Sequence, residues 1–599
     1  MSQRKLHKAE QLMKNINYSL PSISPDNLKL LFASDEDGVP NVFEMDIFNL
    51  SVAKLTDYPD PTYPIGYLPD CQSFLFTSDQ GGNERDHIFL NRGKETIRLT
   101  ESTAAKASFL SWNKDRSGFY YLWNKRDPRF FDLWYMDLQS LEPRSMYENN
   151  GFIVSSVSHD GKFVALNRIN DMNDGDVYAY DVVSKTQQLI SEHSGDARHY
   201  AVAFSSDSSS LYFLTDYGHE FMYLKKYKLK TQEDETVAWF DWDINMVRLS
   251  SSGRYLALVV NSDGRSVLRI RDLLSGEEYE VNQLPEGQVM SLEFSADGRF
   301  LTFVADGSSV PGDVYLLEVD TGSARRMTEA LNPEMCLEDL VEATVERFDT
   351  TDGLPIPGIL YRPHNASEEN RVPAIVFVHG GPGGQSVLTY RPMFQLLVNH
   401  GFAVFCVNNR GSSGYGKNFF RAADHKHGEI DLDDCVSAKE YLASLDFVDA
   451  ERIGIIGGSY GGYMVLAALA FRPDVFTVGV DIFGVSNWLR TLREMPAWWG
   501  AQRTALLKKI GDPETEENYL RRISPLFHAD KIKKPLLVIQ GANDPRVLKV
   551  ESDEIVEKAR NNGVEVEYLV FDDEGHGFRK KKNQIQANDA VVEFLKKHL

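Results

Sequence analysis

Cysteine is scarce in this chain, with four residues among 599. Cys71, Cys336, Cys406 and Cys435 stand far apart and form no Cys-x-x-Cys pair, so the sequence predicts neither a zinc site nor a disulfide framework. This scarcity favours a reducing compartment. The chain also has no run of 18 apolar residues, and its charged residues 1–8 lead into no apolar segment. We therefore expect a cytoplasmic protein without a membrane helix or a secretory signal.

Basic residues are outnumbered by acidic ones, and no long basic stripe offsets the difference. Lysine and arginine total 64 against 87 aspartates and glutamates, which gives a formal net charge of -23. This balance disfavours nucleic acid and anionic membranes as partners. Hydrophobic residues at 42% and charged residues at 25% are ordinary for a folded chain and argue against disorder. Composition leaves open whether the chain forms a homo-oligomer.

A turn followed by short apolar strands recurs seven times in the first half of the chain. Its aligned positions are spaced by 44 to 47 residues: 26, 70, 115, 160, 207, 252 and 297. Each unit repeats one pair of strand phrases, as in 30–34 with 42–46. A sheet of three or four strands cannot bury both faces alone, and radial stacking of copies hides them. The constant spacing disfavours unrelated hairpins in a sandwich, so we predict a seven-bladed all-β propeller at residues 18–328.

Beyond about residue 340 the pattern changes to strands that alternate with helices. Apolar runs predict strands at 374–378, 403–407, 452–456, 477–482, 536–540 and 566–571, with helices at 432–442, 549–561 and 586–598. Such strands, capped by helices, predict a mostly parallel sheet with helices on both faces. We therefore place a linker at 329–345 and this second, α/β domain at 346–599. The amphipathic stretch 5–15 lies in an N-terminal helical segment, 1–17, which we expect to dock on the second domain or near the seam.

One strand runs directly into a helix through a Gly-x-Ser-x-Gly turn, within residues 453–466. The glycines at 457 and 461 let the backbone pass itself closely while the serine oxygen is lifted into the open. The short pattern also arises by chance, but a strand before it and a helix after it make the interpretation specific. This arrangement predicts Ser459 as a catalytic nucleophile.

A serine hydroxyl needs a base to remove its proton and a carboxylate to orient that base. In the α/β-hydrolase order, Ser, Asp and His follow the ends of successive strands. The strand at 535–540 leads to Asp544, and the strand at 566–571 leads to His576 in a glycine-flanked loop. Asp573 is a rival acid, but it lies near His576 in sequence and in an acidic run of the kind that solvent usually covers. We predict Asp544 as the acid and His576 as the base, in preference to a turn aspartate and a surface histidine.

A tetrahedral intermediate also needs donors aimed at its oxyanion. The amide of Tyr460, directly after the nucleophile, is one candidate. The strand at 374–378 ends in the glycine-rich loop 379–384, which brings a second backbone amide close to such a site. Glycines that merely turn the chain are the plainer interpretation. No Lys-Ser or Lys-Thr ends this loop, so a phosphate-binding loop is disfavoured.

With these residues in view, the chain resembles the prolyl oligopeptidase family of serine peptidases, and most of all its acylaminoacyl-peptidase branch. The resemblance spans a propeller followed by an α/β-hydrolase domain, and four motifs carry it: 379–382, 409–416, 457–462 and 543–546. It implies that Ser459, Asp544 and His576 form the catalytic triad.

The resemblance also implies roles for four further residues. The amides of Gly381 and Tyr460 match oxyanion donors, and Tyr415 matches a tyrosine whose hydroxyl serves as a donor in some relatives. Arg546, two residues beyond the acid, matches an arginine that holds a substrate carbonyl. A surface ion pair is the plainer interpretation of Arg546, because spacing alone does not aim its side chain.

The resemblance implies a peptidase that needs neither a cofactor nor a metal. Its substrates would be short peptides, because in this family the propeller covers the active site and excludes folded proteins. Cleavage would pass through an acyl-enzyme and release N-acylated amino acids from blocked peptides.

Three other functions stay open. A dipeptidyl peptidase needs acidic residues that grip a free N-terminus, and the constant repeat spacing leaves no room for the insertion that carries them in relatives. The paired acids at 277–278, 368–369 and 516–517 look like solvated turns or helix faces. A general carboxylesterase would use the same triad on esters. A non-catalytic propeller scaffold is disfavoured by the intact set of Ser, Asp and His.

Two stretches near the motifs have weaker interpretations. Residues 482–499 follow the strand after the nucleophile helix and could form a pocket for an apolar or aromatic side chain, although aromatics there could equally belong to the core. The basic run 579–582, beside His576, reads as solvated charge.

Overall fold

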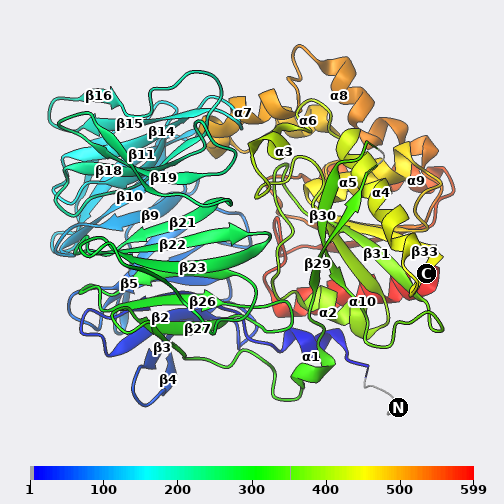
Figure 1. The fold of residues 1–599 in the computed structure, drawn as a ribbon, viewed down its shortest axis with the longest axis horizontal. Coiled ribbons are helices and arrows are strands. Elements are labelled where there is room, and N and C mark those ends of the chain that lie inside the picture. Colours follow the sequence, from blue (N-terminus) through cyan, green and yellow to red (C-terminus); the bar gives the residue numbers. More distant parts are fainter. Residues whose placement is uncertain (1–5, 351) are drawn as a thin grey trace.

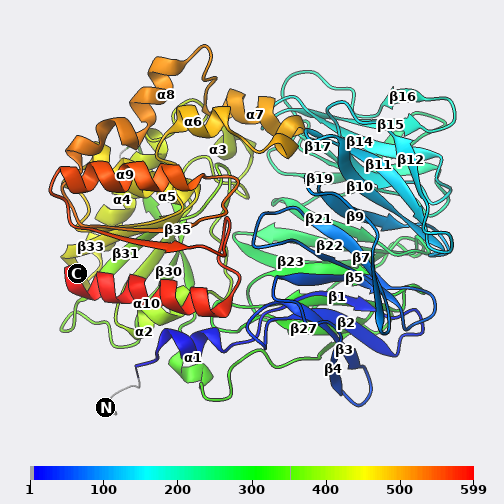
Figure 2. The same ribbon diagram turned by 180° about the vertical axis from the view of Figure 1, so that it is seen from behind.

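The computed structural model describes residues 6–350 and 352–599, which form two domains packed side by side (Figure 1). The propeller, coloured blue to green, contains strands β1 to β28, and the α/β domain contains β29 to β36 with nearly all the helices. The C-terminal helix α10 (Lys581–His598) belongs to the α/β domain, and α1 (Ala9–Met13) packs against it (Figure 2).

The first domain is a ring of seven four-stranded antiparallel sheets, each built from consecutive strands. This confirms the predicted propeller. Its strands are β1 (Tyr18–Ile23), β2 (Lys29–Ser34), β3 (Asn41–Asp46), β4 (Val52–Lys54), β5 (Thr62–Tyr67), β6 (Phe74–Ser78), β7 (His87–Arg92), β8 (Glu95–Arg98), β9 (Ala107–Trp112), β10 (Gly118–Asp127), β11 (Phe130–Asp137), β12 (Pro143–Tyr147), β13 (Ile153–Val157), β14 (Phe163–Ile169), β15 (Gly175–Asp181), β16 (Thr186–Leu189), β17 (His199–Phe204), β18 (Ser210–Thr215), β19 (Tyr223–Lys228), β20 (Asp234–Ala238), β21 (Ile244–Leu249), β22 (Tyr255–Ser262), β23 (Arg265–Asp272), β24 (Glu278–Glu280), β25 (Val289–Phe294), β26 (Phe300–Ala305), β27 (Asp313–Glu318) and β28 (Ser323–Arg326).

The repeated turn has the same backbone conformation in every blade. The residue after each aligned position has a positive φ: Asn27, Cys71, Arg116, Gly161, Ser208, Gly253 and Gly298. A left-handed residue at this point closes the turn between the first and second strands of the blade. The 45-residue repeat thus reflects one recurring turn geometry.

The first and last blades close the ring by side-chain packing, because each blade is complete within its own segment of chain. Phe32 of blade 1 and Val304 of blade 7 belong to one buried hydrophobic cluster. Asn27 donates a hydrogen bond to Asp297 across the same joint, at 2.7 Å.

The second domain is built on one eight-stranded sheet in the order β29-β30-β32-β31-β33-β34-β35-β36. The strands are β29 (Thr344–Asp349), β30 (Pro355–Tyr361), β31 (Val372–Val378), β32 (Ala403–Val407), β33 (Val448–Gly458), β34 (Gly479–Ile482), β35 (Leu536–Gly541) and β36 (Val566–Phe571). From β32 to β36 neighbouring strands are parallel, as predicted, and β29 and β30 add an antiparallel edge. The sequence analysis missed these two strands, because β29 is a mostly exposed, charged edge strand without an apolar run. It begins at Thr344, inside the expected linker.

Helices cover both faces of this sheet (Figure 1). They are α2 (Pro392–Asn399), α3 (Lys417–Arg421), α4 (Ile430–Ser444), α5 (Tyr460–Phe471), α6 (Trp488–Arg493), α7 (Gly500–Ile510), α8 (Glu517–Ile523), α9 (Lys549–Asn561) and α10, with short 3₁₀ turns at Leu337–Asp339, Ala497–Trp499 and Pro525–Lys531. Successive residues of a strand point to opposite faces, so Ile375 packs with α2 and α10 while Val376 packs with α4 and α5.

The N-terminal segment docks on the α/β domain through the short helix α1. Its residues Ala9, Leu12 and Met13 are buried in the same cluster as α2 and α10. Asn15 donates a hydrogen bond to the Tyr390 hydroxyl, which ties the segment to the loop before α2. The helix is shorter than the amphipathic stretch suggested, since only five residues are helical.

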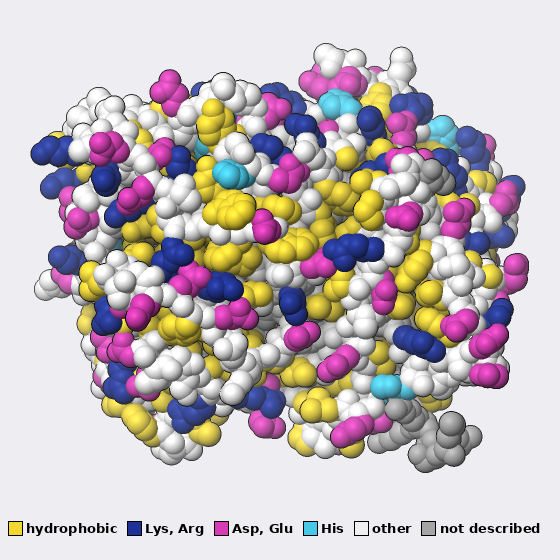
Figure 3. All heavy atoms as spheres, in the orientation of Figure 1, with side chains coloured by type: hydrophobic (Ala, Val, Ile, Leu, Met, Phe, Trp, Pro, Cys, Tyr) yellow, Lys and Arg dark blue, Asp and Glu magenta, His cyan; other side chains and the backbone are white. Residues whose placement is uncertain are grey.

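Charged side chains of both signs are interspersed over the face shown in Figure 3, and hydrophobic side chains gather along the line where the domains meet. Within residues 6–350 and 352–599, no helix is long and apolar enough to cross a membrane. The cytoplasmic location stays a prediction.

Candidate active site

The chain turns sharply at Ser459, between the end of β33 and the start of α5. Ser459 has φ +58° and ψ -118°, which L residues rarely adopt. A Cβ on Gly457 would lie 2.3 Å from the carbonyl carbon of Gly461, and a Cβ on Gly461 would lie 2.0 Å from the Val378 carbonyl oxygen. Only glycine fits at either position, so the two glycines of the motif permit the close approach that presents the serine.

The structure brings the three predicted triad residues together. His576 Nε2 lies 3.0 Å from Ser459 Oγ, and His576 Nδ1 lies 2.6 Å from Asp544 Oδ2. The other oxygen of Asp544 accepts backbone hydrogen bonds from Arg546 at 2.8 Å and Val547 at 2.9 Å. The Asp544 side chain is fully buried and that of His576 nearly so. A base held between a carboxylate and a hydroxyl at these distances can remove the serine proton.

The rival acid, Asp573, faces away from the base. Its carboxylate pairs with Lys580 at 3.0 Å and Lys582 at 3.1 Å and accepts a hydrogen bond from Asn583 at 2.9 Å. Burial raises the pKa of Asp573, but these hydrogen bonds outweigh burial and lower the pKa to about 2. The geometry supports Asp544 as the orienting acid.

The two amides predicted as oxyanion donors make no hydrogen bond in the described part of the chain. The glycine-rich loop passes over Ser459, since a Cβ on Gly380 would lie 3.5 Å from the Ser459 Cβ. Among the residues that the structure describes, neither the Gly381 amide nor the Tyr460 amide donates a hydrogen bond. Burial lowers the pKa of His379 at the start of this loop to about 4, so the ring is neutral, and its Nε2 lies 2.8 Å from Ser412 Oγ. The two amides are free to donate to an oxyanion.

The side chain of Tyr460 is anchored in the core, which fixes its amide. Its hydroxyl donates to the buried Asp431 and lies 2.6 Å from Nδ1 of the buried His427. Asp431 also accepts from the amides of Gly428 and Leu432, each at 2.8 Å. The Tyr460 amide, the predicted oxyanion donor, therefore belongs to a residue whose side chain is also fixed.

Tyr415 lies at the domain seam. Its hydroxyl accepts a hydrogen bond from Asn408 at 3.0 Å, and its ring packs edge-on against Trp242 of the propeller, with 6.2 Å between centroids. Burial raises its pKa to about 12. No hydrogen bond or ring contact joins it to the triad in the described part of the chain, so the structure does not assign its hydroxyl to the oxyanion.

Arg546 extends from the loop of the catalytic acid to the propeller. Its Nε lies 2.8 Å from Glu84 Oε1, and its guanidinium lies 5.9 Å from the centre of the Trp499 ring. The Glu84 side chain is 12% exposed and that of Arg546 is 42% exposed. Arg546 thus forms an ion pair, as its plainer interpretation predicted. The pair lies beside the triad, because the backbone amide of Arg546 donates a hydrogen bond to Asp544.

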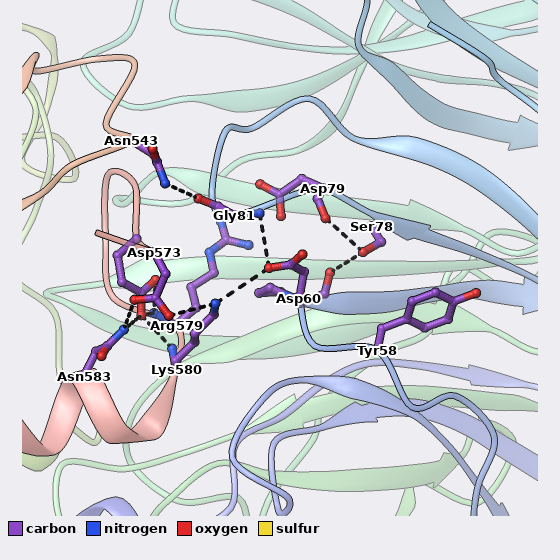
Figure 4. Close-up of polar contacts among 12 residues, drawn as sticks. Tyr58, Asp60, Ser78, Asp79, Gly81, Asn543, Asp573, Arg579, Lys580 and Asn583 are labelled. Carbon is purple, nitrogen blue, oxygen red and sulfur yellow. Dashed lines mark hydrogen bonds and ion pairs between the residues drawn. The ribbon is translucent and has the colours of Figure 1, made fainter. Parts of the chain in front are cut away.

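The propeller contacts the loop that carries Asp544 and the loop that carries His576. Figure 4 shows Asn543, next to the catalytic acid, donating to the carbonyl oxygen of Gly81 at 3.0 Å. The neighbouring Gly82 packs on the histidine loop so tightly that a Cβ there would lie 2.7 Å from the amide nitrogen of Gly575. The loop between β6 and β7 is therefore a wall of the site.

The interpretation of residues 579–582 as solvated charge is wrong for Lys580 and Lys581, whose side chains are largely covered. Lys580 lies 3.7 Å from Asp60 across the seam (Figure 4). Lys581 pairs with Asp35 at 3.0 Å, and Arg579 donates a hydrogen bond to the Tyr63 hydroxyl at 3.2 Å. The Lys582 side chain is widely exposed, at 71%, and Arg579 is exposed as well. Acidic side chains of the first two blades face these cations across the seam, which the sequence did not reveal.

The stretch 482–499 divides between core and site. Trp488 is buried among Tyr460 and Tyr463 and belongs to the core, whereas Trp499 lies near Arg546. The Phe483 ring packs against the His576 ring, with 4.7 Å between centroids.

The sequence analysis missed two residues that shape the site. Glu84 comes from the propeller, and only the Gly-Gly-Asn-Glu turn at 81–84 hints at an unusual loop. Glu574 precedes the histidine by two positions and is buried, and its carboxylate accepts from the amides of Arg579 at 3.1 Å and Lys580 at 3.0 Å. It thereby closes the histidine loop on the start of α10. In the described residues no group of three or more His, Cys, Asp or Glu side chains could hold a metal ion.

Known proteins resemble this chain along nearly its whole length. A family model described as the prolyl oligopeptidase N-terminal beta-propeller domain matches residues 67–330, and one described as the prolyl oligopeptidase family matches residues 388–599. Dipeptidyl peptidase family member 6 of Caenorhabditis elegans is 27% identical over 98% of this chain and 86% of its own length. Dipeptidyl aminopeptidase BIII of Pseudoxanthomonas mexicana is 28% identical over 96% of this chain and 86% of its own.

Other relatives carry a different activity in their names. Acylamino-acid-releasing enzyme 2 of Oryza sativa is 27% identical over 42% of this chain and 33% of its own length. A solved puromycin-hydrolyzing peptidase of Mycobacterium tuberculosis has the same fold, with a TM-score of 0.85 and 20% identity over 99% of this chain and 96% of that one. Two family models match the two domains, and Ser459 lies at the sharp turn between β33 and α5. The chain therefore belongs to the prolyl oligopeptidase family of serine peptidases.

Proposed function

We propose that this peptidase acts on short peptides and releases the N-acylated amino acid from a blocked N-terminus. The observation that carries the proposal is the ion pair of Glu84 with Arg546 beside the triad. A free N-terminus is a cation and needs an unpaired acid, whereas Arg546 already neutralises this one. A blocked N-terminus is neutral and presents a carbonyl, which the half-exposed guanidinium can bind.

In the proposed reaction Ser459 Oγ attacks the carbonyl carbon of the blocked residue while His576 takes its proton. The amides of Gly381 and Tyr460 stabilise the oxyanion. His576 then protonates the leaving amine, and water hydrolyses the acyl-enzyme with the same histidine as base. Asp544 holds the imidazole in position and stabilises its protonated form.

The position of the propeller supports a preference for short substrates. Its loop between β6 and β7 contacts the loops of both Asp544 and His576, so it occupies space on one side of the nucleophile. A folded protein would have to displace this loop, whereas a short peptide would not.

A dipeptidyl peptidase is the second candidate, because two relatives that match over nearly the whole chain carry that activity in their names. Asp79 lies on the same loop as Glu84 and accepts a hydrogen bond from the Glu84 amide at 3.0 Å. No cation lies within ion-pair distance of Asp79 in the described chain, and burial, followed by the charge of Asp86, raises its pKa. An acid without a cation in this position could hold a free ammonium group.

A substrate panel separates these functions. Acetyl-alanyl p-nitroanilide, alanyl-alanyl p-nitroanilide and a p-nitrophenyl ester are assayed side by side, with Ser459→Ala as the control for background hydrolysis. We expect the acetylated substrate to have the highest kcat/KM among the anilides. A preference for the free dipeptide would favour the second candidate and contradict the first, and cleavage of the ester alone would indicate a carboxylesterase.

A further inference from the structure

A cavity of about 550 Å³ lies next to the nucleophile loop, on the side of the sheet that carries α2 and α10. Gly458, directly before Ser459, forms part of its wall, together with apolar side chains such as Phe377, Ile539 and Val591. None of the triad residues lines it. Its volume is within the range of cavities that hold small ligands, about 300–1,000 Å³.

One aromatic ring separates this cavity from the catalytic base. Phe483 lines the cavity and packs against His576, with 4.7 Å between ring centroids. Phe578, which follows the base by two residues, also lines the cavity and packs edge-on against Phe483, at 5.5 Å. Phe483 has φ +44°, a backbone conformation that is costly for a bulky residue. A ligand in the cavity would therefore touch the ring against which the base rests.

Two polar side chains of the cavity wall, Asn588 and Arg391, have capacity left for a ligand. Asn588 is 7% exposed, and its Oδ1 makes no hydrogen bond, while its Nδ2 donates to the Gln584 carbonyl oxygen at 2.7 Å. A buried acceptor without a donor is costly, about 1–3 kcal/mol. Arg391 stands at the same cavity, and no carboxylate lies within ion-pair distance of it in the described chain. The wall thus offers one acceptor and one cation.

The neighbouring polar groups of the wall are already satisfied. Thr389 donates to Asp306 at 2.5 Å, the Tyr390 hydroxyl accepts from Asn15, and Asn17 donates to Asp35. Their hydrogen bonds stay within the protein. Asn588 and Arg391 are therefore the side chains to which a ligand could supply a hydrogen-bond donor and a negative charge.

We propose that this cavity binds an apolar N-acyl amino acid, with its carboxylate on Arg391, its amide N–H on Asn588 Oδ1 and its apolar groups against the sheet. A fatty acid lacks the amide donor, and a free amino acid would bring an ammonium group towards Arg391. Such a ligand is the product of the proposed reaction, so its origin rests on the proposed function, whereas the binding itself does not. Bound there, it presses on Phe483 and changes the rate at which His576 acts.

Binding is tested on the full-length protein after its nucleophile has been blocked with a fluorophosphonate. N-acetyl-L-phenylalanine is titrated into this labelled protein by calorimetry, with L-phenylalanine and N-acetyl-L-phenylalaninamide as comparison ligands. We expect saturable binding of the acid and at least tenfold weaker binding of the other two. Absence of saturable binding, or equal binding of the amide, would overturn the proposal.

Two variants locate the ligand. Arg391→Gln removes the cation, and Ala587→Trp fills the cavity from α10; both are expected to raise the dissociation constant at least tenfold. Arg371→Gln, which changes an exposed arginine just before β31, is the matched control and should bind as the wild type does. Unchanged binding by both cavity variants would place the ligand elsewhere and refute the site. Ala587→Trp could disturb folding, whereas Arg391→Gln replaces an exposed side chain of the cavity rim, so the pair stays informative.

The kinetic effect distinguishes this site from the active site. In unlabelled protein, N-acetyl-L-phenylalanine should lower kcat without purely competitive behaviour, and Arg391→Gln should remove the effect. Purely competitive inhibition, unaltered in Arg391→Gln, would contradict the proposal. If the substrate panel instead favours free dipeptides, the proposed function fails, while calorimetry on the labelled protein still decides whether the cavity binds.

Discussion

A single methyl group added at Gly82, in the propeller, should slow catalysis in the α/β domain. Gly82 lies on the propeller with φ +75°, and a Cβ there would sit 2.7 Å from the amide nitrogen of Gly575, next to His576. Backbone atoms cannot yield as a flexible side chain does. Gly82→Ala must therefore push the histidine loop away or pull the propeller loop back.

The size of the effect follows from the contact distance. Ordinary van der Waals contact begins near 3.4 Å, so the loop must move by several tenths of an ångström. A misplacement of about 1 Å can cost about 100-fold in rate, and we expect a loss of about 10- to 100-fold in kcat/KM. The left-handed backbone adds a strain of roughly 1–2 kcal/mol to the stability of the variant.

A matched control separates strain from displacement. Gly93, in the hairpin between β7 and β8 of the same blade, has φ +68°, and a Cβ there would meet nothing within 4 Å. Gly93→Ala carries the same backbone strain without the clash. The assay compares kcat/KM and the rate of fluorophosphonate labelling for both variants, with thermal unfolding as the check on folding.

The expected outcome is a similar loss of thermal stability in both variants and a loss of activity in Gly82→Ala alone. If Gly82→Ala keeps wild-type kcat/KM, the propeller loop does not position His576 and this reasoning fails. If Gly93→Ala loses as much activity, strain within the blade is the cause.

Three further outcomes follow from the site. Asp544→Asn should lower kcat by about 10⁴-fold, whereas Asp573→Asn should stay within a few fold of wild type; the reverse would make Asp573 the acid. A double-mutant cycle of Glu84→Gln and Arg546→Gln in kcat/KM should give a coupling of about 1 kcal/mol, since the pair is partly exposed, and strict additivity would deny that Glu84 positions Arg546. Burial raises the pKa of Asp481 to about 7, above its unfolded value, so the folded state holds the proton longer and stability falls as pH rises from about 4 to 7. Asp481→Asn should therefore unfold at a higher temperature than wild type at pH 8 but not at pH 4.

The triad could be read from the sequence because each member follows a strand end within a few residues. Parallel strands bring their carboxyl ends to one edge, so Ser459, Asp544 and His576 meet whatever the loops between them do. The repeat spacing revealed the seven blades in the same way, through a local turn that recurs.

The parts of the site that depend on the domain seam could not be predicted. Glu84 meets Arg546 across 462 positions of chain, and no period or motif links them. The basic run at 579–582 looked solvated because the acids that face it, such as Asp35 and Asp60, belong to the propeller, far away in the sequence. Tyr415 matched a motif by position, but it lies at the domain seam, where its hydroxyl accepts a hydrogen bond from Asn408 and its ring packs against Trp242, which sequence spacing does not show.

In our proposal, chemistry and selectivity come from different domains. The predicted nucleophile, base and acid all belong to the α/β domain, whereas the carboxylates that we propose to face a substrate N-terminus, Asp79 and Glu84, come from one propeller loop. The loop contributes charge through its side chains and position through its backbone at Gly82. A change of charge at Glu84 should shift the preference between blocked and free N-termini while the triad stays in place. A shift of the backbone should slow the hydrolysis of both, because it displaces the base on which both depend.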